Sequence, residues 1–364
     1  MKRFFLLGLT ALIALTGCEK DFEVAAPYKD IMLVYGIIDP LDSAHYIRIQ
    51  KAFLDENKSA IEMSKIPDSS YFSNLAVKIQ EYTGTDKLVS ETTLEKVDMN
   101  LEGIQKEPAA NSQGFFTSPN YGYRFKKQVN PSVKYRLIVA NLQTGKNDTS
   151  QFFRTIKTDT GKVSGSNAGP FYIAAFSAAK YEIDFSKTTL GTHVFNLIGT
   201  IPLNAAKFQG KMRFNYVDRN PVDGSEKKKF VEMYIPEKIL QATSYQPTSY
   251  TLETHNRTFY TFLRDAIGLP PANVERYMGL VEVYVYAAGA ELAQYEAINN
   301  SQTGGLTGDQ IKPNFTNMVS KDALGLISSR SFRVYKNARL TDNTIDSLIK
   351  NEITTPLNIK GRAQ

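Results

Sequence analysis

Short runs in which hydrophobic and polar residues alternate dominate the chain from about residue 30 to residue 157. Two clear examples are HYIRIQKAFL (45–54), where Ile47 and Ile49 alternate with polar residues, and LAVKIQEY (75–82), which places Leu75, Val77 and Ile79 on one face. A period of two predicts strands with one buried face. The other runs of this region are IMLVYGIID (31–39), KLVSETTL (87–94), YRFKKQV (123–129), YRLIVANL (135–142) and QFFRTI (151–156). Turn sequences separate these runs, which predicts an antiparallel β-sandwich of the immunoglobulin-like kind over residues 30–157.

The pattern is interrupted by TDTGKVSGSNAGP (158–170), a small, polar and glycine-rich stretch that predicts a linker. A mixed region follows, and its clearest helix is HNRTFYTFLRDAIG (255–268), where apolar residues recur at steps of three and four. Further helices are expected at 291–300 and 341–352. Strands are expected at 172–178, 180–185, 193–201, 211–218, 229–235 and 276–289. Residues 171–364 are therefore predicted to form a second, β-rich α+β domain, and the fold class is mainly β.

The first seventeen residues are arranged like a secretory signal. Lys2 and Arg3 precede an almost wholly apolar run of about a dozen residues, which is too short to span a bilayer as a helix. The run ends in Leu15, Thr16, Gly17 and Cys18, which resembles the lipobox of bacterial lipoproteins. The resemblance implies a signal peptide at 1–17, a diacylglycerol and an acyl chain on Cys18, and a lipid-anchored tether at 18–29. The alternative is an ordinary secreted protein with a chance cysteine.

Composition and charge exclude several classes of function. Cys18 is the only cysteine, so the mature chain is left without disulfides, cysteine-ligated zinc or a thiol nucleophile. Loss of Lys2 and Arg3 with the signal peptide lowers the formal net charge from +6 to +4. Basic residues are scattered among acidic ones, and the only basic cluster, at 227–229, is expected at the rim of a hairpin. We therefore expect no nucleic-acid partner.

The sequence spells out no catalytic motif. His45, His193 and His255 lie far apart, and a Gly-x-Ser-x-Gly elbow is absent. The GGLTG stretch (304–308) lacks the lysine and hydroxyl residue of a phosphate-binding loop. We expect no enzyme activity, and no cofactor beyond the covalent lipid. Paired carboxylates that meet only in space are invisible at this level, so a surface hydrolase remains an alternative.

An acidic turn at 218–224 offers Asp218, Asn220 and Asp223 as oxygen ligands. A calcium ion is one interpretation, but the distal glutamate of an EF-hand is missing. Pro-Val-Asp-Gly is also an ordinary turn sequence, and we expect a turn without a metal.

Aromatic residues gather in QGFFTSPNYGYRF (113–125), with Phe115, Phe116 and Tyr121 as a candidate binding loop. Exposed rings of this kind serve as rigid anchors for a glycan, a peptide or a partner barrel. In the competing interpretation, which we favour, Tyr123 and Phe125 point inward and the other rings cover an edge of the sandwich.

Two further stretches resemble a large group of Bacteroidota outer-membrane lipoproteins of unknown function. The acidic segment after the lipobox, with Glu19, Lys20, Asp21 and Glu23, resembles their surface-export signal. KPNFTNM (312–318) followed by ALGLISSR (323–330) is similar to their closing signature, with Ala323 in place of a glycine and Ser328 in place of a phenylalanine. Many members are encoded with TonB-dependent transporters.

The resemblance implies a surface-facing lipoprotein of the outer membrane that holds a ligand or a partner protein close to a TonB-dependent barrel. An adhesion or envelope protein whose sandwich acts as a spacer is the alternative.

Overall fold

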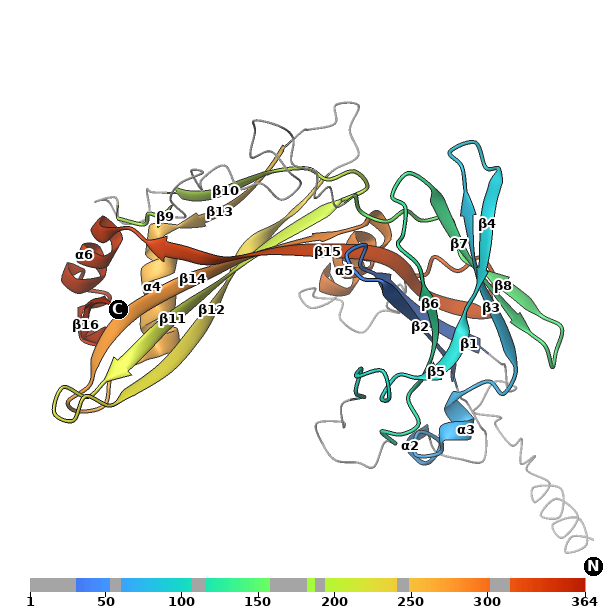
Figure 1. Ribbon diagram of the computed structural model, residues 1–364, viewed down its shortest axis with the longest axis horizontal. Coiled ribbons are helices and arrows are strands. Elements are labelled where there is room, and N and C mark those ends of the chain that lie inside the picture. The colour runs from blue at the N-terminus through green and yellow to red at the C-terminus, as the bar shows by residue number, and fades with distance from the viewer. Residues whose placement is uncertain are drawn as a thin grey trace, which may run out of the picture.

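The computed structural model describes residues 31–52, 60–106, 116–157, 182–186, 194–240, 249–301 and 315–363. The protein is mainly β, as predicted, with a β-sandwich followed by a β-rich domain. The two lie end to end along the long axis of the molecule, and we call them the first and second lobes (Figure 1).

The first lobe is a sandwich of two sheets. One sheet has the order β4-β3-β7-β8, formed by Leu88–Thr93, Leu75–Tyr82, Lys134–Asn141 and Asn147–Thr149. The strands β1, β2, β6 and β5 face it, at Ile31–Ile38, Ala44–Ala52, Tyr121–Lys126 and Glu95–Asp98. Two short helices, α2 (Ala60–Met63) and α3 (Pro67–Ser70), lie between β2 and β3 in the chain.

The predicted alternation is confirmed in these strands. In β7, Tyr135, Leu137 and Val139 are buried and their neighbours are partly exposed, and they pack against the buried side chains of β1, β2 and β3. The strand expected at 151–156 is wrong, because only Phe153 in this segment forms a bridge, to Tyr135. The backbone of residues 147–149 pairs with β7 instead, as β8.

The second lobe is built on a twisted sheet of four long strands. They are β12 (Glu226–Ile239), β11 (Lys207–Arg219), β14 (Glu275–Ala288) and the second half of β15 (Ala323–Leu340). The helix predicted at 255–268 is confirmed as α4 (Asn256–Ile267), those at 291–300 and 341–352 as α5 (Ala290–Ser301) and α6 (Asp342–Lys350). The remaining elements are β9 (Glu182–Ile183), β10 (Val194–Thr200), β13 (Ser249–His255), η1 (Thr355–Leu357) and β16 (Ile359–Arg362). The strand expected at 172–178 lies outside the described residues.

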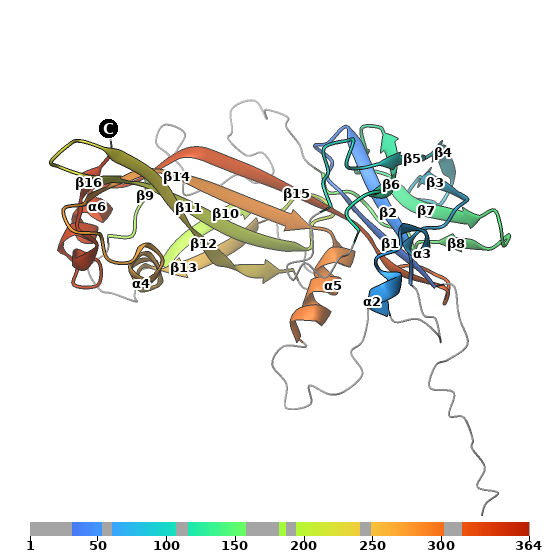
Figure 2. The ribbon, with the colours of Figure 1, turned by 90° about the horizontal axis from the view of Figure 1, so that it is seen from below.

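One face of this sheet carries the core of the second lobe. The paired strands β10 and β13 and the helix α4 pack against it (Figure 2). The contacts are largely aromatic: the ring of Phe259 stacks on Phe185 at 4.0 Å and meets Phe214 at 5.2 Å, and Phe208 stacks on Tyr250 at 4.0 Å. Large ring areas buried in this way supply much of the hydrophobic free energy of a small domain.

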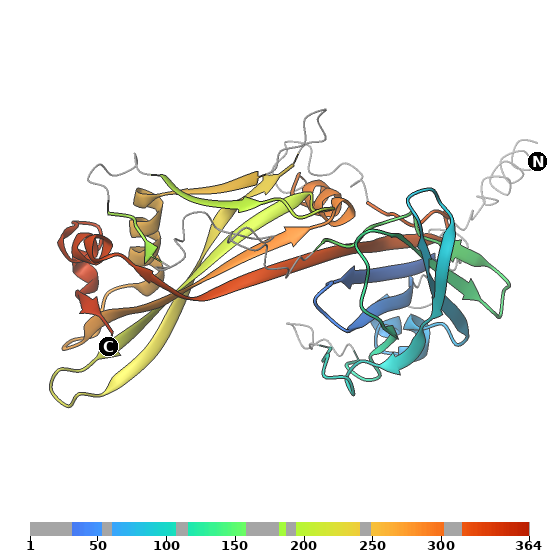
Figure 3. The same cartoon turned by 45° about the horizontal axis from the view of Figure 1, so that its top comes forward.

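The strand β15 belongs to both lobes. The first half of β15 pairs parallel with β1, from Met32–Ala323 to Ile38–Ser329, and the second half pairs antiparallel with β14. Figure 3 shows β15 running from the sandwich through to the far end of the second lobe. Both lobes therefore share one ten-stranded sheet.

This sharing bears on the expected domain division. The linker predicted at 158–170 lies outside the described residues. Met318, Ala323 and Ile327, which we placed in the C-terminal domain, belong to the hydrophobic core of the first lobe. No single cut in the chain would therefore separate the two cores.

The described part of the closing signature, residues 315–318 and 323–330, lies where β15 pairs with β1, and residues 312–314 lie outside the described residues. Asn317, which is 1% exposed, donates from Nδ2 to the Ile327 carbonyl at 2.7 Å and accepts from the Ile327 N–H at 3.0 Å. The Thr316 hydroxyl oxygen accepts from the Gly325 N–H at 2.9 Å. These bonds hold the segment before β15 to the strand that it precedes, and they give partners to the Gly325 N–H and to the N–H and carbonyl of Ile327.

Ser328 has a definite role although the signature has a phenylalanine at this position. Its hydroxyl donates to Glu291 Oε2 at 2.8 Å and accepts from the Leu292 N–H at 3.2 Å, which satisfies a free donor in the first turn of α5. The serine therefore docks α5 onto β15.

Gly325 lies where β15 comes closest to β1. Its φ is +144°, and a Cβ atom placed on it would lie 1.8 Å from the Val34 carbonyl oxygen. Since that oxygen belongs to the backbone of a paired strand, no side-chain motion relieves the contact.

We expect Gly325→Ala to lower the free energy of unfolding by about 3 kcal/mol or more, because it adds a backbone clash to an unfavourable φ. Gly145→Ala is the matched control: its φ is +69° but nothing lies within 4 Å of an added Cβ, so about 1 kcal/mol is expected. Urea unfolding followed by circular dichroism measures both. Equal losses of stability in the two variants would contradict the close approach of β15 to β1 at Gly325.

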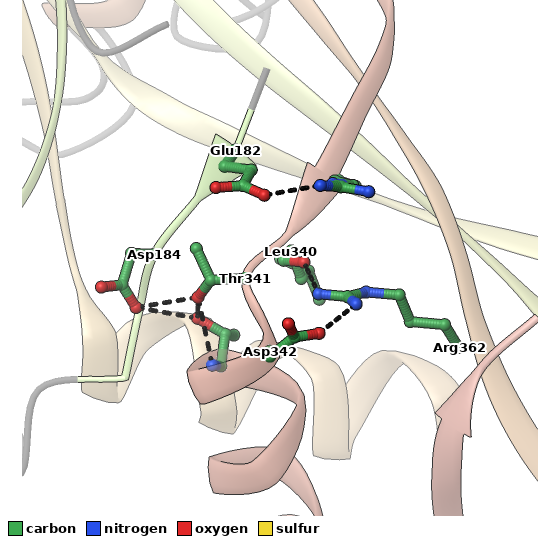
Figure 4. A network of polar contacts seen from close by, with 8 residues as sticks. Glu182, Asp184, Leu340, Thr341, Asp342 and Arg362 are labelled. Carbon is green, nitrogen blue, oxygen red and sulfur yellow. Dashed lines mark hydrogen bonds and ion pairs between the residues drawn. The ribbon is translucent and has the colours of Figure 1, made fainter. Parts of the chain in front are cut away.

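A polar network fixes the start of α6 in the second lobe (Figure 4). The carboxylate oxygen Oδ1 of Asp184 accepts from the hydroxyls of Thr341 and Thr344, both at 3.1 Å. Thr341 is the N-cap of α6, and its own hydroxyl accepts from the Thr344 N–H at 3.2 Å. On the other side, Arg362 of β16 pairs with Asp342 and donates to the Leu340 carbonyl. The network ties β9 and β16 to the end of β15.

The Asp184 contacts set a pH dependence. Burial raises the pKa of Asp184, but hydrogen bonds from Ser186, Thr344 and Thr341 outweigh it and hold the pKa below the usual value. The ionised form is therefore favoured in the folded state, and its contribution to stability is present above about pH 4 and is lost as the pH falls through the folded pKa.

Asp184→Asn keeps the acceptor oxygen and removes the charge, so we expect it to lower the free energy of unfolding by about 1 kcal/mol at pH 7 and by progressively less below pH 4. Asp346→Asn is the control, since it removes an exposed charge from α6 and should change stability by under about 0.5 kcal/mol. Urea titrations between pH 3 and 7 give the comparison. If Asp184→Asn lowered the free energy of unfolding by the same amount at every pH in this range, the lowered pKa of Asp184 would be refuted.

Candidate functional site

The predicted residues at the N-terminus lie outside the described part of the chain. These are Leu15, Thr16, Gly17, Cys18, Glu19, Lys20, Asp21 and Glu23, and Phe115 of the binding loop lies outside it too. Among the helices of the described residues, none is long and apolar enough to cross a membrane.

The rest of the candidate binding loop forms a half-buried aromatic cluster. The rings of Phe116 and Tyr121 meet the edge of Tyr71 at 5.8 and 5.1 Å. Lys106 lies 3.5 Å above the Phe116 ring and Lys96 lies 4.5 Å above that of Tyr121. The outer side of each ring is thus covered by a lysine, and the two rings close the edge of the sandwich.

Asn120 holds this loop in place. It is fully buried, donates from Nδ2 to the Ile104 carbonyl at 2.9 Å, and accepts from Arg48 at 3.0 Å. Tyr123 and Phe125 point into the core, at 4% and 3% exposure. The contacts agree with the interpretation in which the loop covers the sandwich.

Asp218 of the acidic turn and the buried His45 have structural partners, while His193 lies outside the described residues. Asp218 accepts from Arg276 at 2.9 Å and from Lys229 at 2.8 Å, one cation on each carboxylate oxygen. Burial raises the pKa of Asp218, but these two partners outweigh it and lower the pKa. The ring of His45 is buried beside Phe125, and burial lowers its pKa. Groups of three or more His, Cys, Asp or Glu side chains that could hold a metal do not occur among the described residues.

The most distinctive surface is the side of the second-lobe sheet that faces away from α4, β10 and β13. We call it the outer sheet face. Its side chains come from alternate positions of four strands, opposite to the buried ones. They are Gln209, Lys211, Arg213 and Asn215 of β11; Phe230, Glu232 and Tyr234 of β12; Leu280, Glu282, Tyr284 and Tyr286 of β14; and Phe332 and Val334 of β15. Helix α5 contacts one end of it, where Glu296 pairs with Lys207 of β11 at 2.7 Å.

Strand register arranges these side chains in rows across the sheet. Tyr234, Lys211, Tyr284 and Val334 lie opposite one another in one row. Arg213 lies between Glu232 and Glu282 in the next row. In the rows beyond, Gln209, Tyr286 and Phe332 lie on one side, and Phe230, Asn215 and Leu280 on the other. The face therefore has a charged centre with rings on both sides.

Several of these rings are open to solvent. Tyr234 is 60% exposed, Phe230 54% and Phe332 41%. The rings of Tyr284 and Tyr286 lie 6.2 Å apart and within 6° of parallel, and Tyr286 meets Phe332 at 5.8 Å. Contiguous exposed apolar surface on a soluble domain marks an interaction site.

The charges at the centre neutralise one another. Glu232 Oε1 accepts from Lys211 at 3.0 Å and from Arg213 at 2.8 Å, and Arg213 lies 3.6 Å from Glu282. The hydrogen bonds from Lys211 and Arg213 lower the pKa of Glu232. The Arg213 guanidinium also lies over the Phe230 ring at 4.4 Å, which fixes both side chains.

A cavity of about 330 Å³ between the lobes is a second candidate, lined by Lys134, Phe152, Phe153, Arg154, Asn204, Ala290 and Glu291. Burial raises the pKa of Glu291, although its bond with Ser328 opposes this. Lys134 is already paired with Asp86 at 2.6 Å, and Asn204 donates to the Pro131 and Thr155 carbonyls. Since its polar groups are engaged within the protein, this cavity offers less to a ligand than the outer sheet face.

Sequence reasoning missed the outer sheet face, although a signal was present. In KFVEMYI (229–235) and VEVYVY (281–286) the positions that alternate with core residues are aromatic or charged. Aromatic residues on the side of a strand opposite its core residues indicate a sheet whose second face is also a contact surface.

Comparisons with known proteins give no family. No family model and no curated protein matches the chain. Among solved structures, the C-terminal globular domain of an oligosaccharyltransferase from Pyrococcus abyssi is 9% identical, and the match covers 86% of this chain and 50% of that one with a TM-score of 0.17. The calcium binding domain CBD12 of CALX1.1 is 8% identical over 85% of this chain and 99% of that one, and CBD12 from CALX1.2 is 9% identical over 84% and 100%; both TM-scores are 0.15. TM-scores this low do not indicate a shared fold.

The outer sheet face makes a prediction for stability. We expect Phe230→Thr and Tyr234→Thr each to change the free energy of unfolding by less than about 1 kcal/mol, because their rings are exposed and threonine suits a strand. Phe214→Ala, on the opposite face of β11, should cost about 3–5 kcal/mol. Urea unfolding gives all three values. A loss above about 2 kcal/mol in either outward variant would mean that this face is packed.

Proposed function

We propose that this protein is a non-catalytic lipoprotein of the outer membrane, anchored through Cys18, which holds a ligand on its outer sheet face beside a TonB-dependent transporter. The observation that carries the proposal is that face, with exposed rings around a neutralised charged centre. The lipobox and the closing signature support the anchor and the association with a barrel.

The order of the chain fits such a role. The segment between Cys18 and Ile31 reaches at most about 45 Å when fully extended. It leads directly into β1, so an anchor at Cys18 would keep the first lobe close to the membrane. The outer sheet face belongs to the second lobe, at the other end of β15 (Figure 1).

The second lobe offers contact chemistry to a ligand. Rings and planar polar groups bind by stacking and hydrogen bonding, and an open sheet face presents them without a deep pocket. Arg213 and Glu232 are locked in ion pairs, which suits them to holding a ligand in one orientation.

A spacer that places another protein away from the membrane is the second candidate. The continuous sheet through β15 favours it, since a shared strand makes a stiff connection between the lobes.

Affinity purification from detergent-solubilised outer membranes tests the proposal. We expect the lipidated, tagged protein to bring down a TonB-dependent barrel in near-equal amount, and Cys18→Ala to lose it because the variant is not anchored. Recovery of the lipidated protein alone would refute the association and favour the spacer.

A further inference from the structure

We infer that the ligand of the outer sheet face is a neutral, hydroxyl-rich glycan; the inference rests on the binding role proposed above. It follows from three features of the face: where its charges lie, which polar atoms remain available, and how its rings are placed.

The position of the charges argues against a protein partner. Protein interfaces have few charged residues at their centre and place them at the rim. Here Lys211, Arg213, Glu232 and Glu282 occupy the middle of the face, with rings on either side. A protein covering this face would remove four charged groups from water, at a high desolvation cost. A glycan can bind them through hydroxyls and bridging water and leave them partly hydrated.

The sum of the charges argues against a charged ligand. Two cations and two carboxylates lie within one cluster, joined by contacts of 2.8 to 3.6 Å. The local field therefore attracts neither phosphate nor an acidic polymer over a basic one. Because the charges of this cluster cancel, a neutral polymer is the class of ligand that it favours.

Hydrogen-bonding atoms remain available beside the rings. Glu232 takes its ion pairs on Oε1, while Oε2 has no partner among the described residues. Among the residues that the structure describes, the hydroxyl of Tyr234 and the side-chain amide of Gln209 also have no hydrogen-bond partner. Hydroxyl groups both donate and accept, so a sugar can bind all three at once.

The rings supply the apolar half of the contact. A pyranose has one face of C–H groups, which packs on an aromatic ring. Tyr284, Tyr286 and Phe332 form a row of adjacent rings, at 6.2 and 5.8 Å between centroids. Tyr234 lies across Lys211 from Tyr284, so the contact surface extends over all four strands. This extent fits a chain of sugars better than a single one.

The test uses the full mature chain with Cys18→Ala, run in native gels that contain neutral polysaccharides (α-glucans, β-glucans, mannan, xylan) or the acidic polygalacturonate and heparin. We expect retardation by at least one neutral polysaccharide and none by the acidic ones. Calorimetry with oligosaccharides from the retarding polymer then gives a Kd. The double variant Tyr234→Ala, Phe332→Ala should raise it at least tenfold with an unchanged urea midpoint.

Tyr35→Ala is the matched control, because this ring is 44% exposed but lies on β1 in the first lobe, and the Kd should not change. Absence of retardation by every neutral polymer, retardation by the acidic ones alone, or a Kd that the double variant leaves unchanged would each overturn the inference. The double variant in the lipidated chain separates the two proposals: it should still bring down the barrel. If it loses the barrel, the face binds protein and the glycan assignment is wrong, while the association with a transporter stands.

Discussion

The pairing of β15 with β1 is the contact on which the rest of the structure depends. It joins residues almost three hundred positions apart and places Ala323 and Ile327 in the core of a lobe formed mostly by the first 157 residues. Gly325 allows the two backbones to approach, and Asn317 satisfies the buried backbone groups of Ile327. Because β15 then continues into the second lobe, backbone hydrogen bonds fix the orientation of one lobe to the other. A hydrogen-bonded strand is stiffer than a flexible linker.

The way in which the second lobe builds its core explains why a broad face of its sheet is left open. The sheet of the second lobe uses its inner face for an aromatic core around Phe259 and Phe208, and α4, β10 and β13 suffice to cover that face. Its edge strand β12 carries three lysines at 227–229 and Pro236, features that discourage pairing with another strand. Contact by the edge is thus disfavoured, whereas the outer sheet face keeps its rings exposed.

Local patterns predicted local structure well, and long-range pairing poorly. Alternation identified β2, β3 and β7, and the three- and four-residue steps of Phe259 and Leu263 identified α4, because each pattern reports one buried face. Nothing in the sequence near β1 or β15 indicates that the two strands pair in parallel. A domain division based on composition therefore could not show that residues 318–327 belong to the core of the first lobe. The rings near Tyr121 are close together in sequence, so the sequence indicated them as a cluster. Those of the outer sheet face come from three strands and lie together only because of how the strands pair. Segment 151–156 has a strand composition, but only Phe153 is paired, to the backbone of Tyr135.

The exposed rings also help to decide between a spacer and a binding protein. A spacer needs a stiff connection, which the continuous sheet provides, but it gains nothing from aromatic surface. Phe230, Tyr234 and Phe332 lie within one face and leave apolar area in water, which is a liability for aggregation unless it serves a contact. A polar residue at each of these positions would leave the fold unchanged, because their inward neighbours, such as Met233 and Phe214, supply the core. Stiffness and exposed rings are both accounted for when the first lobe and β15 hold the outer sheet face at a fixed orientation for a ligand.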